Sequence, residues 1–313
     1  MAYWQTVPSG FRNRLDELVQ VVSACRDVFH EIADTYKWIP AANSPAALDA
    51  AALPSPDPQI TDPTGETGHR LIAEAIQIFL LSASGHLGGL AGLYQSAEVL
   101  FSPPLLIRAV IENCAHAVWI LGDDPNEPAE KRLARVYLEE LKSAEEARKN
   151  TGRLQNKTGP TYERVDNAYK KLKKEILSRF PQATKQELGD WTLEGEKLPS
   201  LEIAVKWMYS LTEAAGGTIN QDAASGVYGL LSNLTHPTLY PVREQRRWVY
   251  DVANDQATAD LYVDVESVVK DARAAIAAFY NSLTYVISYF GWSTQAMAAL
   301  EEKIEVVIPD FIR

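Results

Sequence analysis

Apolar side chains recur every three to four residues along most of this chain, the spacing of one face of an α-helix. Residues 11–36 show the pattern clearly, with Leu15, Leu18, Val22 and Ile32 on one side. Further helices are predicted at residues 66–93, 103–122, 127–153, 161–180, 200–215, 220–235, 257–291 and 294–304. Sustained alternation of β-branched residues is lacking. We therefore predict an all-α fold, a multi-helix bundle of about eight or nine helices.

The charge pattern divides this bundle into three parts of one composite domain. Residues 1–125 and 181–313 are predicted as the N-terminal and C-terminal parts of the helical core. Residues 126–180 are predicted as a charged helical hairpin, because two long helical patterns there have only a narrow apolar stripe. Acidic and basic residues alternate in the hairpin at helical spacing, which indicates a protruding, solvated and self-paired surface.

Two segments depart from the regular pattern. Residues 40–68 are rich in Pro, Ala, Ser and Asp and show no sustained period, so we expect a long surface loop, mobile or packed across another element, which could act as a lid. The second segment contains Gly85, Gly88, Gly89 and Gly92 within a predicted helix. Glycines there lower helix propensity but let another backbone approach closely, and His86 lies within the same patch.

The predicted helix at residues 103–122 is apolar nearly all round but carries one line of ionisable groups, Arg108, Glu112 and His116. Such groups must be paired, solvated in a cleft or shifted in pKa, since an unpaired buried charge is costly. They could supply an anion-binding cation, a carboxylate and a general acid or base. The alternative is a structural network with neighbours on the following helix, namely Arg132, Arg135 or Glu139.

A second polar line repeats this spacing near the end of the predicted helix at residues 220–235: Tyr228, Ser232 and His236. It suits substrate binding or a proton relay if it faces the first line. The alternative is a helix end at which His236 binds a free carbonyl and Ser232 bonds back to the preceding turn. The candidate catalytic residues are therefore His116, Glu112 and His236, and the candidate ligand-binding residues are Arg108, Tyr228, Ser232 and His86.

Composition narrows the classes of partner. A net charge of −11 and a pI near 5.0 disfavour non-specific nucleic-acid binding, so no DNA partner is expected. Cys25 and Cys114 fall in apolar helical patterns, as reduced core thiols do, and no zinc-type spacing is present. We expect neither a metal nor a cofactor. The N-terminal residues do not resemble a secretory signal, and polar residues interrupt the apolar tracts, so we expect a cytoplasmic protein without membrane contact.

Three stretches together resemble a known family: RAVIENCAHAVWILG at residues 108–122, EKRLARVYLEEL at 130–141 and YGLLSNLTHP at 228–237. They are similar to bacterial helical proteins that look distantly related to the HEPN superfamily, whose members include RNA-cleaving toxins and antiphage proteins. The resemblance implies an all-helical fold, a homodimer, and RNA or a nucleotide as ligand. The spacing from Arg108 to His116 is longer than in the family's catalytic pattern.

Three functions are compatible with this sequence. The first is a cytoplasmic HEPN-like binding or defence-associated protein with a central polar pocket. The second is an enzyme that holds a small anionic ligand at Arg108 and uses His116 or His236 as acid and base. The third is a non-catalytic scaffold that assembles through its helical hairpin.

Overall fold

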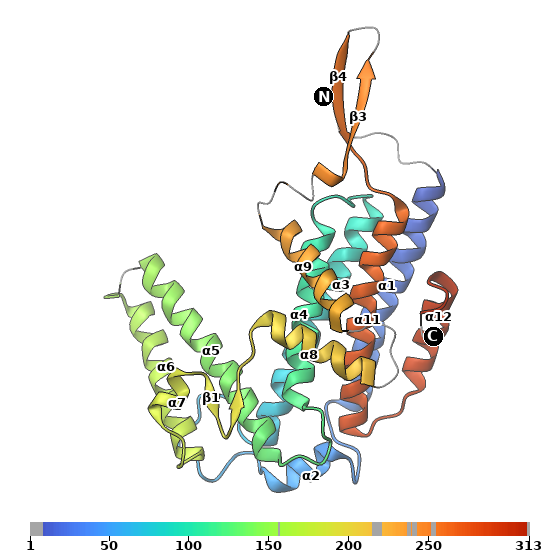
Figure 1. Cartoon of the computed structure of the whole chain (residues 1–313). Coiled ribbons are helices and arrows are strands. Elements are labelled where there is room, and N and C mark those ends of the chain that lie inside the picture. Colours follow the sequence, from blue (N-terminus) through green and yellow to red (C-terminus); the bar gives the residue numbers. More distant parts are fainter. Residues whose placement is uncertain are drawn as a thin grey trace.

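The computed structural model describes residues 9–155, 157–214, 221–236, 239, 243–251 and 255–311. Helices make up 72% of the structure, which confirms the predicted all-α bundle (Figure 1). The long helices are α1 (Ser9–Tyr36), α3 (His69–Gln95), α4 (Pro103–Leu121), α5 (Ala129–Gln155), α6 (Pro160–Arg179), α8 (Leu201–Ala214), α9 (Gln221–Thr235), α11 (Val265–Phe290) and α12 (Gln295–Val307).

The core forms around α4, which packs against α3, α11, α8 and α9, while α1 packs against α3, α11 and α12. The pattern of α4 explains its central place: Ile107, Val110, Cys114, Val118 and Ile120 are all fully buried and lie around most of the helix surface. A helix that is apolar nearly all round is stable in water only when other elements cover it. Because neighbouring helices cover α4, its polar side chains Arg108, Glu112 and His116 must face those helices.

Helices α5 and α6 form the predicted charged hairpin, and Figure 1 shows them leaning away from the core. The first half of α5 is buried, whereas the second half carries the predicted self-paired charges. Lys142 and Glu146 approach to 2.9 Å, and Lys149 and Glu145 approach to 2.7 Å. Each exposed pair of this kind contributes only about 0.3–0.5 kcal/mol, so these charges serve solubility more than stability.

The junction of α4 and α5 is fixed by Arg132, whose side chain is only 1% exposed. Its guanidinium donates to the carbonyl of Leu121 at 2.9 Å and to that of Asp124 at 2.8 Å, and it pairs with Asp49 at 3.0 Å. The hydroxyl of Tyr289 on α11 donates to the same carboxylate at 2.8 Å. This buried network therefore joins the α4–α5 junction to α11 and to the segment before α3.

That segment, residues 40–68, differs from the expected irregular loop. It contains the helix α2 (Pro45–Ala52), which begins at Ser44, whose hydroxyl accepts a hydrogen bond from the Ala47 amide at 3.1 Å. Further on, the amide and hydroxyl of Thr64 donate to Glu175 of α6 at 2.8 and 2.9 Å. Because α2 is short and mostly alanine, it has no hydrophobic period to recognise. The segment is packed across other elements, as one of the two expected alternatives has it, and its role as a lid stays a prediction.

The predicted helix at residues 257–291 is also wrong in its first part. Residues there form β4 (Gln256–Leu261), which pairs antiparallel with β3 (Arg246–Asp251), and this ribbon projects from one end of the bundle (Figure 1). Helix α11 begins only after Asp264, whose carboxylate accepts from the Ser267 amide at 2.8 Å. The connection at residues 181–199 holds the short helix α7 (Lys185–Gly189) and the two-residue strands β1 (Thr192–Leu193) and β2 (Glu196–Lys197).

Two described helices, α3 and α4, are long and apolar enough to cross a membrane by length and composition alone. Within the most apolar window, 39% of α3 and 67% of α4 is buried in the bundle. Core helices of soluble proteins pass the same test, so this is weak evidence for a membrane span. The absence of membrane contact stays a prediction.

Candidate functional site

The two predicted polar lines meet at one point, between α4 and α9. The guanidinium of Arg108 donates to Glu112 at 2.6 Å, to the hydroxyl of Thr235 at 2.6 Å and to that of Tyr228 at 3.4 Å. The Tyr228 hydroxyl in turn donates to Glu112 at 2.8 Å. Arg108 also lies over the ring of Tyr228, 5.4 Å from its centre. These four side chains form a closed cluster, which we call the α4–α9 cluster.

The charged and polar groups of the α4–α9 cluster stabilise one another. Burial raises the pKa of Tyr228 to about 12, and the hydrogen bond to Glu112 raises it as well. Burial alone would lower the pKa of Arg108, but the hydrogen bond and the charge of Glu112 outweigh it and raise that pKa. Each nitrogen of the guanidinium already has a partner within the chain. The cluster therefore stabilises the contact between α4 and α9 and leaves Arg108 poorly placed to hold a ligand.

His116 lies away from this cluster. Its Nδ1 contacts Glu139 of α5, and its ring stacks on Phe79 of α3 with ring centres 5.5 Å apart. The physical reason is helical drift: residues eight apart differ by about 80° around the axis, so His116 faces α5 while Arg108 faces α9. Of the three network partners expected from the sequence, Glu139 is the one that His116 meets.

Ser232, His236 and His86 also lie outside the α4–α9 cluster. His236 is exposed at the end of α9, where its amide donates to the carbonyl of Ser232 at 3.1 Å. The cluster uses Thr235 instead, because residues seven apart, such as Tyr228 and Thr235, differ by only about 20° around a helix. His86 is half-buried on α3, and among the described residues no hydrogen bond or ion pair joins it to Arg108 or Glu112.

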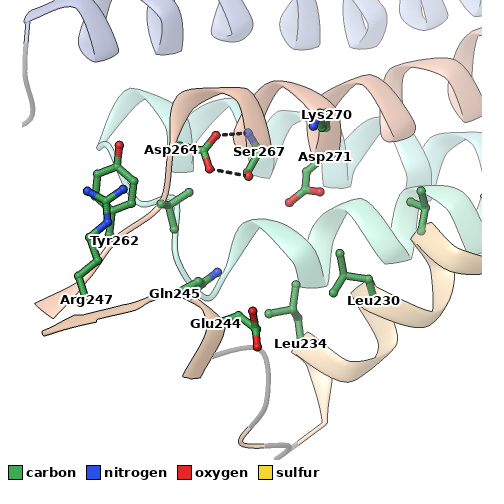
Figure 2. Close-up of a pocket in the computed structure, with 12 residues that line it drawn as sticks. Leu230, Leu234, Glu244, Gln245, Arg247, Tyr262, Asp264, Ser267, Lys270 and Asp271 are labelled. Carbon is green, nitrogen blue, oxygen red and sulfur yellow. Dashed lines mark hydrogen bonds between the residues drawn. The ribbon is translucent and has the colours of Figure 1, made fainter. Parts of the chain in front are cut away.

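A cavity of about 520 Å³ lies on another side of α9, between that helix, the base of the β3–β4 ribbon and the start of α11 (Figure 2). We call it the α9–α11 pocket. Its apolar wall includes Val227, Leu230 and Leu234 of α9. The polar lining residues are Glu244, Gln245, Arg247, Tyr262, Asp264, Ser267, Lys270 and Asp271. An apolar pocket with a few converging polar groups is the usual form of a small-molecule site.

Most polar groups at the mouth of the α9–α11 pocket already have partners. Asp264 accepts from the amide of Ser267 at 2.8 Å and from its hydroxyl at 2.9 Å, so it caps α11. The guanidinium carbon of Arg247 lies 3.5 Å from the centre of the Tyr262 ring. Figure 2 shows this stacked pair at the opposite end of the pocket from Asp271. Asp264, Ser267, Arg247 and Tyr262 therefore stabilise the walls of the pocket.

Asp271 is different. Figure 2 shows its carboxylate pointing from α11 toward the α9 helix that carries Leu230 and Leu234. Burial raises the pKa of Asp271 from 3.8 to about 6, and its carboxylate has no ion-pair or hydrogen-bond partner among the described residues. Two further buried polar atoms in this part of the structure lack a described hydrogen-bond partner: Gln245 Oε1, in the pocket lining, and the Tyr94 hydroxyl. Burial raises the pKa of Tyr94, and the nearby charge of Asp271 raises it further.

The sequence does not predict this pocket, because residues 257–261 were expected to be helical and instead form part of the ribbon that makes one wall. One local signal was available. The stretch D-V-E-S at residues 264–267 places a capping aspartate three residues before a serine, which is a helix start. A helix beginning there would have left residues 256–261 free to form a strand and Asp271 in the second turn of α11.

Among the described residues, no three His, Cys, Asp or Glu side chains are grouped so that they could hold a metal ion. Comparison of the chain with family models, with curated proteins and with solved structures finds no significant match. The resemblance to HEPN proteins therefore stays a prediction.

Proposed function

We propose that this protein binds a small organic cation with an apolar body in the α9–α11 pocket. The observation that carries the proposal is Asp271, a carboxylate held partly out of water beside a cavity of about 520 Å³. A protein stabilises such a group with an arginine, a lysine or hydrogen-bond donors when its role is structural. Asp271 has no such described partner, and so a cationic ligand would supply the missing interaction.

The rest of the pocket favours the same ligand chemistry. Gln245 Oε1 is a buried acceptor without a described partner, so a ligand that donates N–H groups satisfies it together with Asp271. Leu230 and Leu234 offer apolar contact for a hydrocarbon or ring. An ammonium about 4 Å from the carboxylate gains about 4 kcal/mol of Coulomb energy in an environment of intermediate polarity. Of the two basic lining residues, Arg247 lies at the far end from Asp271, where it repels the cation least, and Lys270, next to Asp271 in α11, is exposed to solvent that screens its charge.

The earlier alternatives have less structural support. A nucleotide or other anion at Arg108 would have to displace Glu112, Tyr228 and Thr235 from the guanidinium. Acid and base chemistry shared by His116 and His236 would need the two rings on one side of α4, whereas His116 is turned toward α5. We therefore assign the α4–α9 cluster a structural role. Its function would be to hold α9, and with it one wall of the pocket.

We place this binding function in the cytoplasm. Cys25 and Cys114 are fully buried free thiols, and burial raises the pKa of each to about 12. Unreactive core thiols of this kind suit a reducing compartment.

Three molecules with the same six-carbon tail test the proposal: hexylammonium, 1-hexanol and hexanoate. Isothermal titration near pH 7.5 should show binding of hexylammonium, weaker binding of the alcohol and no binding of the carboxylate. Asp271→Asn should weaken hexylammonium at least tenfold, which is about 1.4 kcal/mol of the Coulomb term. The matched control is Glu266→Gln, which removes one charge from the same helix outside the pocket lining. Equal affinity for the ammonium and the alcohol, or no effect of Asp271→Asn, would contradict the proposal.

A further inference from the structure

Two of the carboxylates that line the α9–α11 pocket come from different elements. Glu244 lies two residues before β3, so it reaches the pocket from the base of the ribbon, whereas Asp271 reaches it from α11. Figure 2 shows the two carboxylates apart from each other, with Leu230 and Leu234 of α9 along the wall. The pocket therefore combines two separated acidic groups with an apolar surface.

Glu244 has no partner within the described part of the chain. The residue is exposed, and no ion pair or hydrogen bond of the described side chains includes its carboxylate. Arg246 and Arg247 follow closely, but each guanidinium carbon lies over an aromatic ring, 4.6 Å and 3.5 Å from the ring centre respectively. The third lining carboxylate, Asp264, is occupied as the cap of α11. Of the lining carboxylates, Glu244 and Asp271 are therefore the two without a described partner.

A ligand with one ammonium group can pair with only one of these two separated carboxylates. The other carboxylate keeps its charge near the apolar body of the ligand, and a charge next to hydrocarbon is unfavourable. A linear diamine carries an ammonium at each end and methylene groups between them, which suit the leucine wall of α9. The net charge of −11 on the chain also attracts a dication more strongly than a monocation.

We propose that the cation bound in the α9–α11 pocket is a linear aliphatic diamine, an inference that rests on the organic-cation site of the proposed function. One ammonium pairs with Asp271 and the other with Glu244, while the chain between them covers Leu230 and Leu234. Asp271 is the more buried carboxylate and supplies most of the affinity, because an exposed ion pair such as that of Glu244 contributes little. Glu244 instead determines specificity, since it distinguishes a ligand with a second cation from one with an apolar end.

Isothermal titration near pH 7.5 tests the proposal with pairs of ligands of equal chain length. The pairs are 1,4-diaminobutane with butylammonium, 1,6-diaminohexane with hexylammonium, and 1,8-diaminooctane with octylammonium. Symmetry alone makes a diamine bind about twofold more tightly, because either of its ends can pair with Asp271. At the chain length that spans the two carboxylates, the diamine should bind at least about fivefold more tightly than its monoamine, and the other lengths should show a smaller ratio.

Glu244→Gln should reduce this ratio of dissociation constants to about two, whereas Glu266→Gln, a change at an exposed residue of α11 outside the pocket lining, should leave it unchanged. Taking a ratio removes the general loss of attraction that follows removal of any negative charge. Circular dichroism checks that both variants keep their helices.

Two outcomes separate this inference from the function on which it rests. A ratio of two or less at every chain length, or an equal ratio in Glu244→Gln and the unmodified protein, overturns the diamine. Hexylammonium binding that still depends on Asp271 would then leave the proposed function in place. If hexylammonium does not bind, or binds Asp271→Asn equally well, the proposed function and the diamine both fail.

Discussion

Asp271 makes the protein's stability depend on pH, and the sign follows from its environment. Burial raises the pKa of this carboxyl in the folded state from 3.8 to about 6. A raised folded-state pKa means that the native protein holds the proton more tightly than the unfolded chain. Its favourable contribution is therefore complete below about pH 3.8 and is lost as pH rises through about 6.

The size of the effect follows from the same shift. About 2 pKa units at 1.36 kcal/mol each correspond to about 3 kcal/mol lost by pH 7.5, with about half of it already lost at pH 5. Asp271→Asn keeps the shape of the protonated side chain and carries no charge. We expect the variant to be more stable than the unmodified protein by up to about 3 kcal/mol near pH 7.5, and the gain should shrink toward pH 4.

Urea unfolding followed by circular dichroism at pH 4.5, 6 and 7.5 measures this difference. Glu266→Gln, with an exposed carboxylate on the same helix, serves as the control and should show no comparable gain. If Asp271→Asn has the same stability as the unmodified protein at pH 7.5, or a lower one, then Asp271 has a partner in the folded chain. A cationic ligand would then not be needed to pair its charge.

Three further perturbations test other parts of the structure. Arg132→Met should lower the free energy of unfolding by about 3–5 kcal/mol, since it leaves Asp49 charged and buried, and thermal unfolding measures the loss. Tyr228→Phe should cost about 1.5–3 kcal/mol through its lost hydrogen bond to Glu112, and a free energy of unfolding equal to that of the unmodified protein would refute the structural role of the α4–α9 cluster. Gly85→Ala should raise the free energy of unfolding by about 0.5–1 kcal/mol, because an added Cβ meets no atom within 4 Å at this exposed position of α3, and thermal unfolding measures the gain.

Local pattern was sufficient to predict the helices that build the core. Helix α4 was expected because its apolar residues cover the surface between Pro103 and Gly122, and its observed bounds are Pro103–Leu121. The charged hairpin was also predictable, since a narrow apolar stripe with paired charges is a property of sequence alone. These features depend on burial of residues that are close together in the chain.

The β3–β4 ribbon depends on pairing between two segments, and the pocket depends on contacts that are distant in the chain. Alanine-rich β4 has little intrinsic preference for a strand, and it becomes one because β3 supplies its backbone partners, as in the pairing of Trp248 with Ala259. Asp271 acquires its environment from α9, about 40 residues earlier, so no local motif marks it.

The two polar lines show how a correct local observation can mislead. Spacing of four residues predicts Arg108, Glu112 and His116 on one line, but the drift of about 40° per step turns the third residue to another neighbour. The same drift removes His236 from the α4–α9 cluster and brings in Thr235. A seven-residue spacing would have identified Tyr228 and Thr235 as the pair that shares a face.

If ionised Asp271 recognises an organic cation, the affinity for hexylammonium must depend on pH. Titration between pH 4.5 and 8 should show the affinity rising as pH passes about 6, where Asp271 loses its proton, and levelling off above that pH. In Asp271→Asn the affinity should be weak and independent of pH over the same range. An affinity for hexylammonium that is the same in both proteins at every pH would contradict the account.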